Sequence, residues 1–305
     1  MDDYEFAILG SGPAGLSSAI YAARFRLKTI VIGELPGGLI TTTHLIENWP
    51  GIISISGLDL AESLKKHAEA NDVLSVQGKV TDVKTTKHGF MISLEDGAKY
   101  SAKSVLFATG TTRRKLNIPG EKEFTNKGVS YCAVCDGALF KNKIVCIIGG
   151  SDSAVKESLF LAEHASKVYI IYRGDKLRAE PINMDRMNAN KKIEVITNRD
   201  LSEIFGEKSV KGVKFKEGGE LAVDGVFVEI GATPNSGLAE QLGVFLNEKK
   251  EIIADSNSST NVPGVFAAGD VTNSHFKQAI TGASEGVIAA FSAFDYLDLP
   301  STLKK

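Results

Sequence analysis

The chain has 305 residues, of which 43% are hydrophobic and 24% are charged, and its formal net charge is −2. Its length suggests two domains with ordinary buried cores, and its balanced charge offers no basic field for nucleic acid. We expect a soluble protein of a reducing cytoplasm, since no apolar run is long enough to span a membrane, the acidic N-terminus is unlike a secretory signal, and three cysteines make no disulfide framework.

The first predicted unit is a strand, a glycine-rich turn, a helix and a second strand. Residues 6–9 and 29–32 are short apolar runs typical of buried strands. Between them, Gly10-Ser11-Gly12-Pro13-Ala14-Gly15 fits a G-x-G-x-x-G dinucleotide fingerprint. The glycines allow a tight turn, close approach of the backbone to a pyrophosphate, and close helix–strand packing, while the helix N-terminus offers free N–H groups to phosphates. Glu34, just past the second strand, is either a ribose ligand or a solvated loop charge.

The next segments predict the remaining strands of this domain and the linker that leaves it. Residues 76–94 alternate apolar and polar side chains around a turn at 87–89, which predicts half-exposed antiparallel strands. Residues 104–110 return to a buried strand that ends in a turn of small residues. The basic stretch 111–115 predicts a linker into a second domain.

Two cysteines separated by two residues, Cys132 and Cys135, form the most informative feature of the chain. Such a pair closes into an easily reduced disulfide, and its thiols often have depressed pKa values. A zinc site would need two further soft or imidazole ligands at matching spacing, but Cys146 lies in an apolar run and the five histidines form no local pair. We therefore predict a redox-active pair and no metal, with a purely structural disulfide as the alternative.

A second nucleotide-binding unit follows the cysteines. A strand at 143–148 leads into Gly149-Gly150-Ser151-Asp152-Ser153-Ala154, a helix to about residue 164 and a strand at 168–172. Ser151 occupies the position of the middle glycine, where a side chain obstructs close approach of the backbone to a pyrophosphate. Serine is nevertheless small and can donate a hydrogen bond to phosphate.

The last segments predict a return to the first domain. A strand at 226–231 and a turn at 234–237 precede another apolar strand that ends in Gly269-Asp270. A carboxylate at the end of a strand can bond the polyol hydroxyls of a cofactor, although a helix cap or turn is the alternative role for Asp270. An Ala- and Gly-rich helix at 280–297 closes the chain. The predicted fold class is α/β, with two Rossmann-like, three-layer ββα nucleotide-binding domains, one of them discontinuous (residues 1–113 and 237–305) around the other (114–236).

This combination resembles the low-molecular-weight thioredoxin reductases, the bacterial and archaeal flavoproteins of class II of the pyridine nucleotide-disulfide oxidoreductases. The resemblance covers essentially the whole chain and is carried by segments 10–15, 41–43, 47–51, 108–110, 132–137, 264–271 and 278–281. It implies an FAD-binding first domain, a middle domain that binds NADPH, a homodimer, and reduction of thioredoxin or a thioredoxin-like protein. It also implies rotation of the middle domain about hinges near 111–114 and 231–237.

The resemblance assigns roles to individual residues. Cys135 exchanges electrons with the flavin, Cys132 attacks the disulfide of the partner, and Asp136 gives and takes protons, with a helix cap as its alternative role. The implied FAD-contacting residues are Gly10, Ser11, Gly12, Pro13, Ala14, Gly15, Glu34, Gly38, Leu39, Thr43, Asn48, Val80, Ala108, Thr109, Gly110, Gly269, Asp270, Lys277, Gln278 and Ala279. The candidate residues for a donor nucleotide are Gly149, Ser151, Asp152, Ser153, Arg173 and Arg178.

The chain departs from the family pattern mainly at the donor site. The first departure is Ser151. The second is in the family's His-Arg-Arg-x-x-x-Arg segment, which here begins Tyr172-Arg173-Gly174 and keeps Arg178. A third lies in the first domain, where the family's Gly-Gly-Gln is here Gly37-Gly38-Leu39. Loss of one charged contact removes about 1.5–3 kcal/mol, or roughly one to two powers of ten in affinity.

Two donor hypotheses therefore stay open. One is NADPH or NADH, bound weakly, and the other is a different donor such as reduced ferredoxin or a second bound cofactor. A non-enzymatic FAD-binding redox module is a further alternative. A related flavoprotein of peroxide systems normally carries an additional N-terminal disulfide domain, so we do not expect that function.

Overall fold

The computed structural model describes residues 3–298, and the chain divides into two compact units. Unit 1 comprises the residues up to Thr112 and those from Pro234 onward, and unit 2 comprises Arg113–Thr233. The domain boundaries predicted from the sequence, after residues 113 and 236, lie one and three residues further along the chain. None of the described helices is long and apolar enough to cross a membrane.

Unit 1 is built on a seven-stranded sheet in the order β3-β2-β1-β6-β5-β4, with β17 also paired to β6. The parallel strands are β1 (Asp3–Leu9), β2 (Thr29–Gly33), β3 (Leu74–Gln77), β6 (Lys99–Phe107) and β17 (Val265–Ala267). The antiparallel strands β4 (Val80–Thr86) and β5 (Gly89–Leu94) form the predicted meander. All residues of β2 are buried, as expected for a strand covered on both faces.

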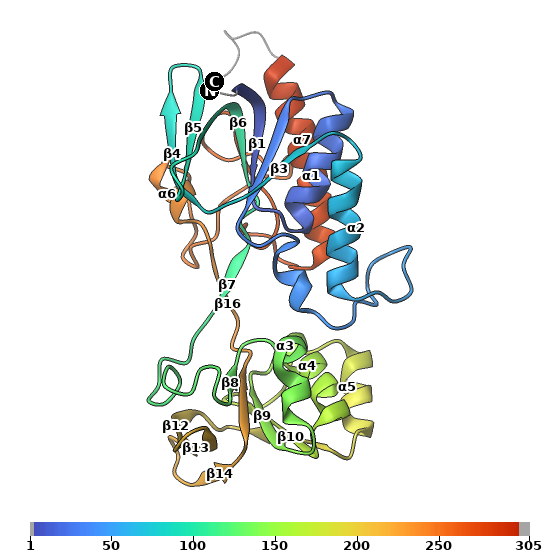
Figure 1. Ribbon diagram of the computed structural model, residues 1–305, viewed down its shortest axis with the longest axis vertical. Coiled ribbons are helices and arrows are strands. Elements are labelled where there is room, and N and C mark those ends of the chain that lie inside the picture. Colours follow the sequence, from blue (N-terminus) through green and yellow to red (C-terminus); the bar gives the residue numbers. More distant parts are fainter. Residues whose placement is uncertain (1–2, 299–305) are drawn as a thin grey trace. The chain divides into compact units, whose positions relative to one another are not determined.

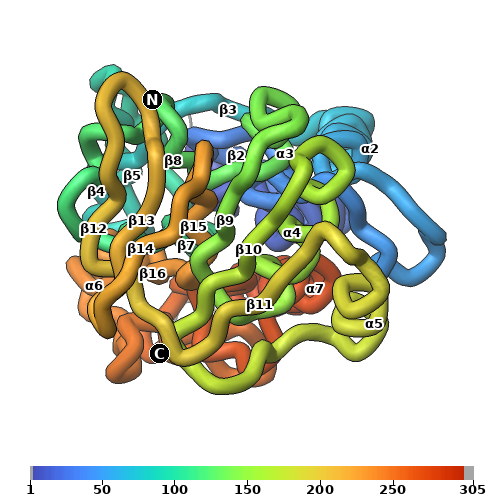
Figure 2. Tube along the Cα trace, turned by 90° about the horizontal axis from the view of Figure 1, so that it is seen from below, coloured from blue at the N-terminus to red at the C-terminus, as the bar shows by residue number. Residues whose placement is uncertain are grey.

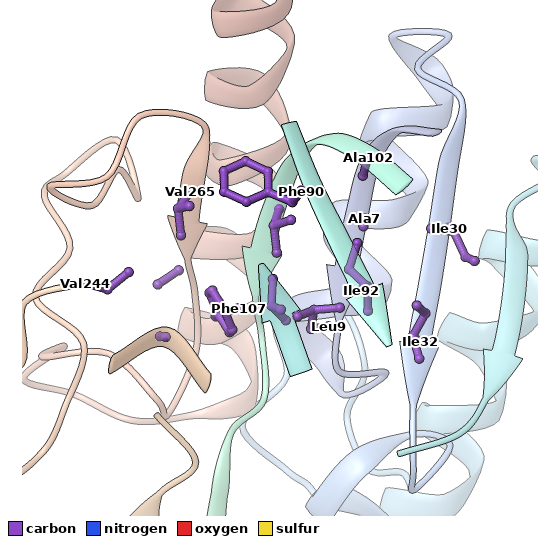
Figure 3. Packing of buried hydrophobic residues seen from close by; sticks show 14 of the residues in the cluster. Ala7, Leu9, Ile30, Ile32, Phe90, Ile92, Ala102, Phe107, Val244 and Val265 are labelled. Atoms are coloured by element: carbon purple, nitrogen blue, oxygen red, sulfur yellow. The ribbon is translucent and has the colours of Figure 1, made fainter. Parts of the chain in front are cut away.

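Helices α1 (Pro13–Arg24), α2 (Gly57–Glu69) and α7 (Ala279–Asp298) lie together beside this sheet (Figure 1). The approach of α7 to α1 is very close, because a Cβ added at Gly286 would lie 2.0 Å from the backbone oxygen of Ala14. On the other side of the sheet, Leu9, Ile92 and Phe107 meet in an apolar cluster (Figure 3). Short helices η1 (Gly38–Thr42) and α6 (Gly237–Gln241) complete the unit.

Unit 2 has a parallel five-stranded sheet in the order β11-β10-β9-β15-β8. Its strands are β8 (Val129–Ser130), β9 (Ile144–Ile148), β10 (Lys167–Tyr172), β11 (Ile193–Thr197) and β15 (Gly225–Val228). Figure 2 shows this sheet between α4 (Asp152–His164) and α5 (Pro181–Ala189) on one side and a small antiparallel sheet on the other. The small sheet comprises β12 (Leu201–Gly206), β13 (Val210–Phe215) and β14 (Glu220–Ala222), and α3 (Ala133–Asp136) and η2 (Gly137–Phe140) connect β8 to β9.

The chain passes between the units in a short two-stranded sheet. Strand β7 (Thr111–Arg113) pairs with β16 (Ala232–Pro234). The sequence predicted a linker at 111–115 and a turn that begins only at 234. The preceding strand also ends earlier than predicted, at Val228, and Gly231 has a φ of +97°, which interrupts the extended backbone. Because each crossing segment supplies backbone partners for the other, residues without strand-like patterning become strands here.

The contact between α1 and α7 predicts a stability effect. Gly286→Ala should destabilise unit 1 by about 1–2 kcal/mol, because the new methyl group must displace the Ala14 backbone and overpacking outweighs the gain of about 1 kcal/mol in helix propensity. Urea unfolding measures the change. Gly237→Ala is the control, since its Cβ would meet nothing within 4 Å, and an equally small effect of both variants would contradict the prediction.

Candidate cofactor and redox sites

The turn after β1 forms a cradle of backbone. Gly10 has a φ of +117°, and a Cβ there would lie 2.1 Å from the Ala108 backbone oxygen. A Cβ at Gly15 would lie 1.9 Å from the Gly10 oxygen, so only glycine lets α1 start this close to β1. At Gly12 the space is open, with the nearest atom, the Gly38 Cα, 3.8 Å away. The open position faces the start of α1, which has no side-chain cap.

The end of β17 lies against the same helix start. A Cβ at Gly269 would be 3.1 Å from the Ala14 Cβ, and the Gly269 N–H donates to Glu285 Oε2 at 2.7 Å. Burial raises the pKa of the Asp270 carboxyl, Lys277 opposes this shift and Glu285 adds to it. Lys277 Nζ also donates to the Asp270 backbone oxygen at 2.9 Å. A half-buried carboxyl group thus follows the strand beside the glycine turn.

Several other predicted cofactor residues meet through long-range bonds. Asn48 Nδ2 donates to Gln278 Oε1 at 3.2 Å, although the two residues are 230 positions apart. The Thr109 hydroxyl donates to the Asn235 backbone oxygen at 2.8 Å, and Asn235 Nδ2 donates to the Thr109 oxygen at 2.9 Å. The loop of Thr43 is tied to α2 because the Gly57 N–H donates to the Thr43 oxygen at 3.0 Å. These bonds close the loops around the turn.

The remaining predicted residues lie in several other elements of unit 1. A pocket beside the turn is lined by Ser11, Gly33, Gly37 and Gln77, and Glu34 directly follows Gly33 in an exposed loop. Val80 begins β4 and pairs with Leu94, so it belongs to the antiparallel layer. Three further predicted residues, Leu39 in η1, Gly110 before β7 and Ala279 at the start of α7, complete the set. The open cradle, the half-buried carboxyl and the pocket fit a dinucleotide such as FAD.

The redox pair lies in unit 2 at the start of α3. Cys132 and Cys135 form a disulfide with their Cα atoms 5.3 Å apart. Cys132 is the N-cap residue of α3, and the Cys135 N–H lies 3.1 Å from Cys132 Sγ. Cys135 is exposed and Cys132 is half-buried. The third cysteine, Cys146, is fully buried in β9, and burial raises the pKa of its thiol far above the usual range.

The second glycine turn differs from the first in what covers it. Gly149 again meets backbone, since its Cβ would lie 2.2 Å from the Glu229 oxygen. The Tyr172 ring, however, lies between Gly150 and Gly174, where an added Cβ would be 2.5 Å and 2.6 Å from ring atoms. The Arg178 N–H donates to the Gly150 oxygen at 2.7 Å, and Arg178 Nη2 donates to the Tyr172 hydroxyl at 3.0 Å. The loop after β10 is therefore folded onto the turn.

The other candidate donor residues also have partners within unit 2 or lie in solvent. Asp152 Oδ1 accepts from the Glu180 N–H and from Asn183 Nδ2, each at 2.9 Å, and Lys156 Nζ lies 2.9 Å from Oδ2. Burial opposes these bonds, but together they lower the pKa of Asp152. Ser151 is the exposed N-cap residue of α4, its side chain makes no capping bond, and Ser153 follows in the first turn.

Comparison with known proteins places this geometry in a family. The family model described as pyridine nucleotide-disulphide oxidoreductase matches residues 4–286. The fold is similar to that of thioredoxin reductase from Lactococcus lactis, with a TM-score of 0.93, 39% identity, and coverage of 96% of this chain and 99% of that one. The chain belongs to the pyridine nucleotide-disulphide oxidoreductases and, within them, to the family of bacterial-type thioredoxin reductases.

Two further relatives of this reductase family differ in length or named chemistry. A ferredoxin-flavin thioredoxin reductase from Clostridium acetobutylicum is 34% identical, with a TM-score of 0.55 and coverage of 98% of both chains. One component of the alkyl hydroperoxide reductase from Staphylococcus aureus is 39% identical over 302 residues, which are 97% of this chain and 59% of that protein. The chain thus spans less than two thirds of the curated relatives that it matches.

Ser130 contacts the predicted redox site, although the sequence motifs did not predict it as a site residue. Its buried hydroxyl donates to Asp136 Oδ2 at 2.6 Å and accepts from the Cys132 N–H at 3.1 Å. Asp136 is also the residue before η2, but its side chain makes no capping bond there, so the predicted alternative role as a cap is not seen. Ser130 therefore fixes the carboxyl group beside the disulfide turn. A serine two residues before the first cysteine was the only signal in the sequence.

Glu121 is a second missed residue and holds the segment before the cysteines. It is buried, and its carboxyl accepts from the N–H groups of Leu116 and Asn117 at 2.8 and 2.6 Å. The Tyr131 hydroxyl donates to Glu121 Oε1 at 2.9 Å. Burial and this bond raise the pKa of Tyr131 to about 12, so the phenol stays protonated and keeps its bond. The residue next to Cys132 is thereby anchored to the chain that follows β7.

The Ser130 bonds predict a kinetic effect. Ser130→Ala should slow reduction of the Cys132–Cys135 disulfide by a dithiol about tenfold, because Asp136 loses its orienting donor and proton transfer depends on position. Stopped-flow kinetics measures the rate. Ser166→Ala, which removes an exposed hydroxyl bonded to the Lys143 oxygen, is the control. Equal rates for the wild type and Ser130→Ala would show that Ser130 has no such role.

Proposed function

We propose that the chain is an FAD-dependent thioredoxin-disulfide reductase, in which the Cys132–Cys135 pair reduces thioredoxin or a thioredoxin-like protein. The observation that carries the proposal is the disulfide at the start of α3 with a carboxyl group held beside it by Ser130. A purely structural disulfide would need no such group, and no third cysteine competes, because Cys146 is buried.

The proposed disulfide exchange needs one side chain near the cysteine pair that can hold and release protons. Reduction of the disulfide takes two electrons and two protons, and the thiolate form of Cys132 then attacks one sulfur of the partner's disulfide. The other partner sulfur leaves and takes a proton. Cys135 next attacks Cys132 Sγ, which restores the internal disulfide and releases the second partner sulfur, again with a proton. Asp136, bonded to Ser130, is the group proposed to hold and deliver these protons.

Unit 1 supplies the residues proposed to hold FAD. The turn around Gly12 and the open start of α1 suit a pyrophosphate, and the Asp270 carboxyl suits a polyol hydroxyl. The Asn48–Gln278 pair holds two loops together where the family contacts the cofactor. When bound and reduced by an electron donor, FAD would supply the two electrons that reduce the disulfide. As the family resemblance implies, we also propose a cytoplasmic homodimer, which light scattering on the purified protein would test.

A second candidate concerns the electron donor. Tyr172 covers Gly150, and Arg178 is bonded to Tyr172 at the turn where the family binds NADPH. Gly174 replaces a charged residue, and Ser151 replaces a glycine. These features favour weak binding of NADPH or NADH and leave reduced ferredoxin as an alternative donor; one relative bears a ferredoxin-dependent name. Anaerobic bleaching of the flavin by NADPH, NADH or reduced ferredoxin distinguishes the donors.

Removing the attacking sulfur gives the most direct prediction for catalysis. Cys132→Ser should abolish reduction of a thioredoxin-like disulfide by the dithionite-reduced protein, while the flavin absorbance of the purified protein stays unchanged. Insulin precipitation coupled to thioredoxin measures turnover. Cys146→Ala is the control and should keep turnover, since the buried thiol takes no part. Retained turnover in Cys132→Ser would refute the assigned nucleophile.

Because the Tyr172 ring covers the glycine turn of unit 2, variants that uncover this turn should bind NADPH more tightly. The triple variant Ser151→Gly, Tyr172→His, Gly174→Arg should lower the KM for NADPH about 10–100-fold, because it opens the turn and restores a charged contact with a 2′-phosphate. Steady-state reduction of the flavin measures KM.

Gly174→Arg alone is the matched control. It should bring no gain, because its Cβ would lie 2.6 Å from the Tyr172 ring. A wild-type protein that already binds NADPH at low micromolar concentration would contradict the prediction.

A further inference from the structure

Lys277 and Glu251 form an ion pair in unit 1, close to the end of β17. Lys277 Nζ donates to Glu251 Oε1 at 2.5 Å, and only 27% of the Lys277 side chain and 15% of the Glu251 side chain is exposed. The same nitrogen donates to the backbone oxygen of Asp270 at 2.9 Å. The nearby pair of Lys250 and Glu240 lies in solvent by contrast, with 63% and 53% of the two side chains exposed. The pair of Lys277 and Glu251 is therefore partly shielded from water, and salt screens it less than a surface pair.

A short hairpin presents Glu251 to this lysine. Leu246 and Ile252 pair across the hairpin in antiparallel fashion, and Asn247 begins its turn. The Glu251 N–H donates to Asn247 Oδ1 at 3.0 Å, and Asn247 Nδ2 donates to Glu251 Oε2 at 2.7 Å. Burial opposes ionisation of Glu251, but the bonds from Lys277 and Asn247 lower the pKa of its carboxyl group below the usual value. Glu251 is therefore charged at neutral pH, with one oxygen oriented by the turn and the other bonded to Lys277.

The hairpin binds both ends of the loop that follows β17. At the start of the loop, the Ile252 N–H donates to the Val271 oxygen at 2.9 Å. At its end, Glu251 holds Lys277, and Gln278 follows directly in the chain. Glu251 is not among the residues predicted to contact FAD, but the loop that it closes carries several of them.

The bonds of Lys277 leave the Asp270 carboxyl group open. Lys277 bonds to the backbone oxygen of Asp270, and none of residues 3–298 donates a hydrogen bond to the carboxyl group itself. We propose that Glu251 is a positioning residue for the FAD site. By holding Lys277 on the Asp270 backbone oxygen, it keeps the lysine from pairing with the Asp270 carboxylate, which stays available to a cofactor hydroxyl. This inference rests on the proposed binding of FAD in unit 1.

Loss of the charge at Glu251 would release Lys277 from this position. The lysine side chain is long and flexible, and the Asp270 carboxylate belongs to the residue that it already contacts. Another carboxyl group beside this strand end, that of Glu285, accepts from the Gly269 N–H at 2.7 Å. Lys277 would therefore pair with Asp270 and occupy acceptor positions that a cofactor hydroxyl needs. FAD would lose one hydrogen bond to a charged group, which corresponds to about a tenfold to hundredfold loss of affinity.

The test measures how fast FAD leaves the purified, FAD-loaded full chain, from the rise in fluorescence of free flavin after dilution. Glu251→Gln keeps the shape of the side chain and removes its charge. This variant should release FAD about tenfold to hundredfold faster than the wild type, because a loss of affinity within one site appears mainly in the dissociation rate. Glu240→Gln breaks the exposed pair with Lys250 and is the matched control, which should follow the wild type. An unchanged release rate in Glu251→Gln would overturn the proposal.

A second background separates this role from a merely structural one. Because Glu251 acts through Lys277, Glu251→Gln should not speed the release of FAD any further once Lys277→Met is present. A hairpin that only stabilises the fold would give the same acceleration in both backgrounds, and that result would overturn the proposal. The double variant carries neither charge, so its comparison with Lys277→Met decides the matter even if Glu251→Gln alone does not fold. A wild-type protein that binds no FAD would instead refute the proposed cofactor and, with it, the proposed function.

Discussion

Both units depend on one constraint, which is the close approach of backbone to backbone where a strand turns into a helix. In unit 1 the Gly10 and Gly15 positions have a carbonyl oxygen where any side chain would begin, and in unit 2 Gly149 has the same relation to Glu229. This contact draws the start of each helix onto the carboxyl ends of the parallel strands. Every candidate site of the protein is built on one of these two helix starts or on the segment that leads to the second.

The two turns share this constraint but differ in what lies over them. Around Gly12 there is open space, with a half-buried carboxyl group at Asp270 nearby, and this environment suits a dinucleotide. Over Gly150 lies the ring of Tyr172, and a Cβ at position 174 would lie 2.6 Å from the same ring. A side chain at position 174 would therefore require the Tyr172 ring to move.

The amino-acid sequence was sufficient to predict those strands and helices that depend on a local pattern of residues. Apolar runs followed by glycine turns predicted β1, α1, β9 and α4, and alternation predicted β4 and β5. The sequence could not predict the contacts that form only when distant segments meet. The Asn48–Gln278 bond and the Tyr172 ring over Gly150 each join segments whose local pattern says nothing about the partner. The crossing strands β7 and β16 were missed because each is extended only by pairing with the other.

The central claim is that Cys132 passes electrons to a protein disulfide while Asp136, held by Ser130, handles the protons. Trapping the covalent complex tests it most directly. The reduced Cys135→Ser variant is mixed with an oxidised thioredoxin-like protein, and the products are mapped by mass spectrometry. The account predicts a stable mixed disulfide through Cys132, since the resolving thiol is gone. A mixed disulfide that forms through Cys135 in the Cys132→Ser variant, with none in Cys135→Ser, would contradict it.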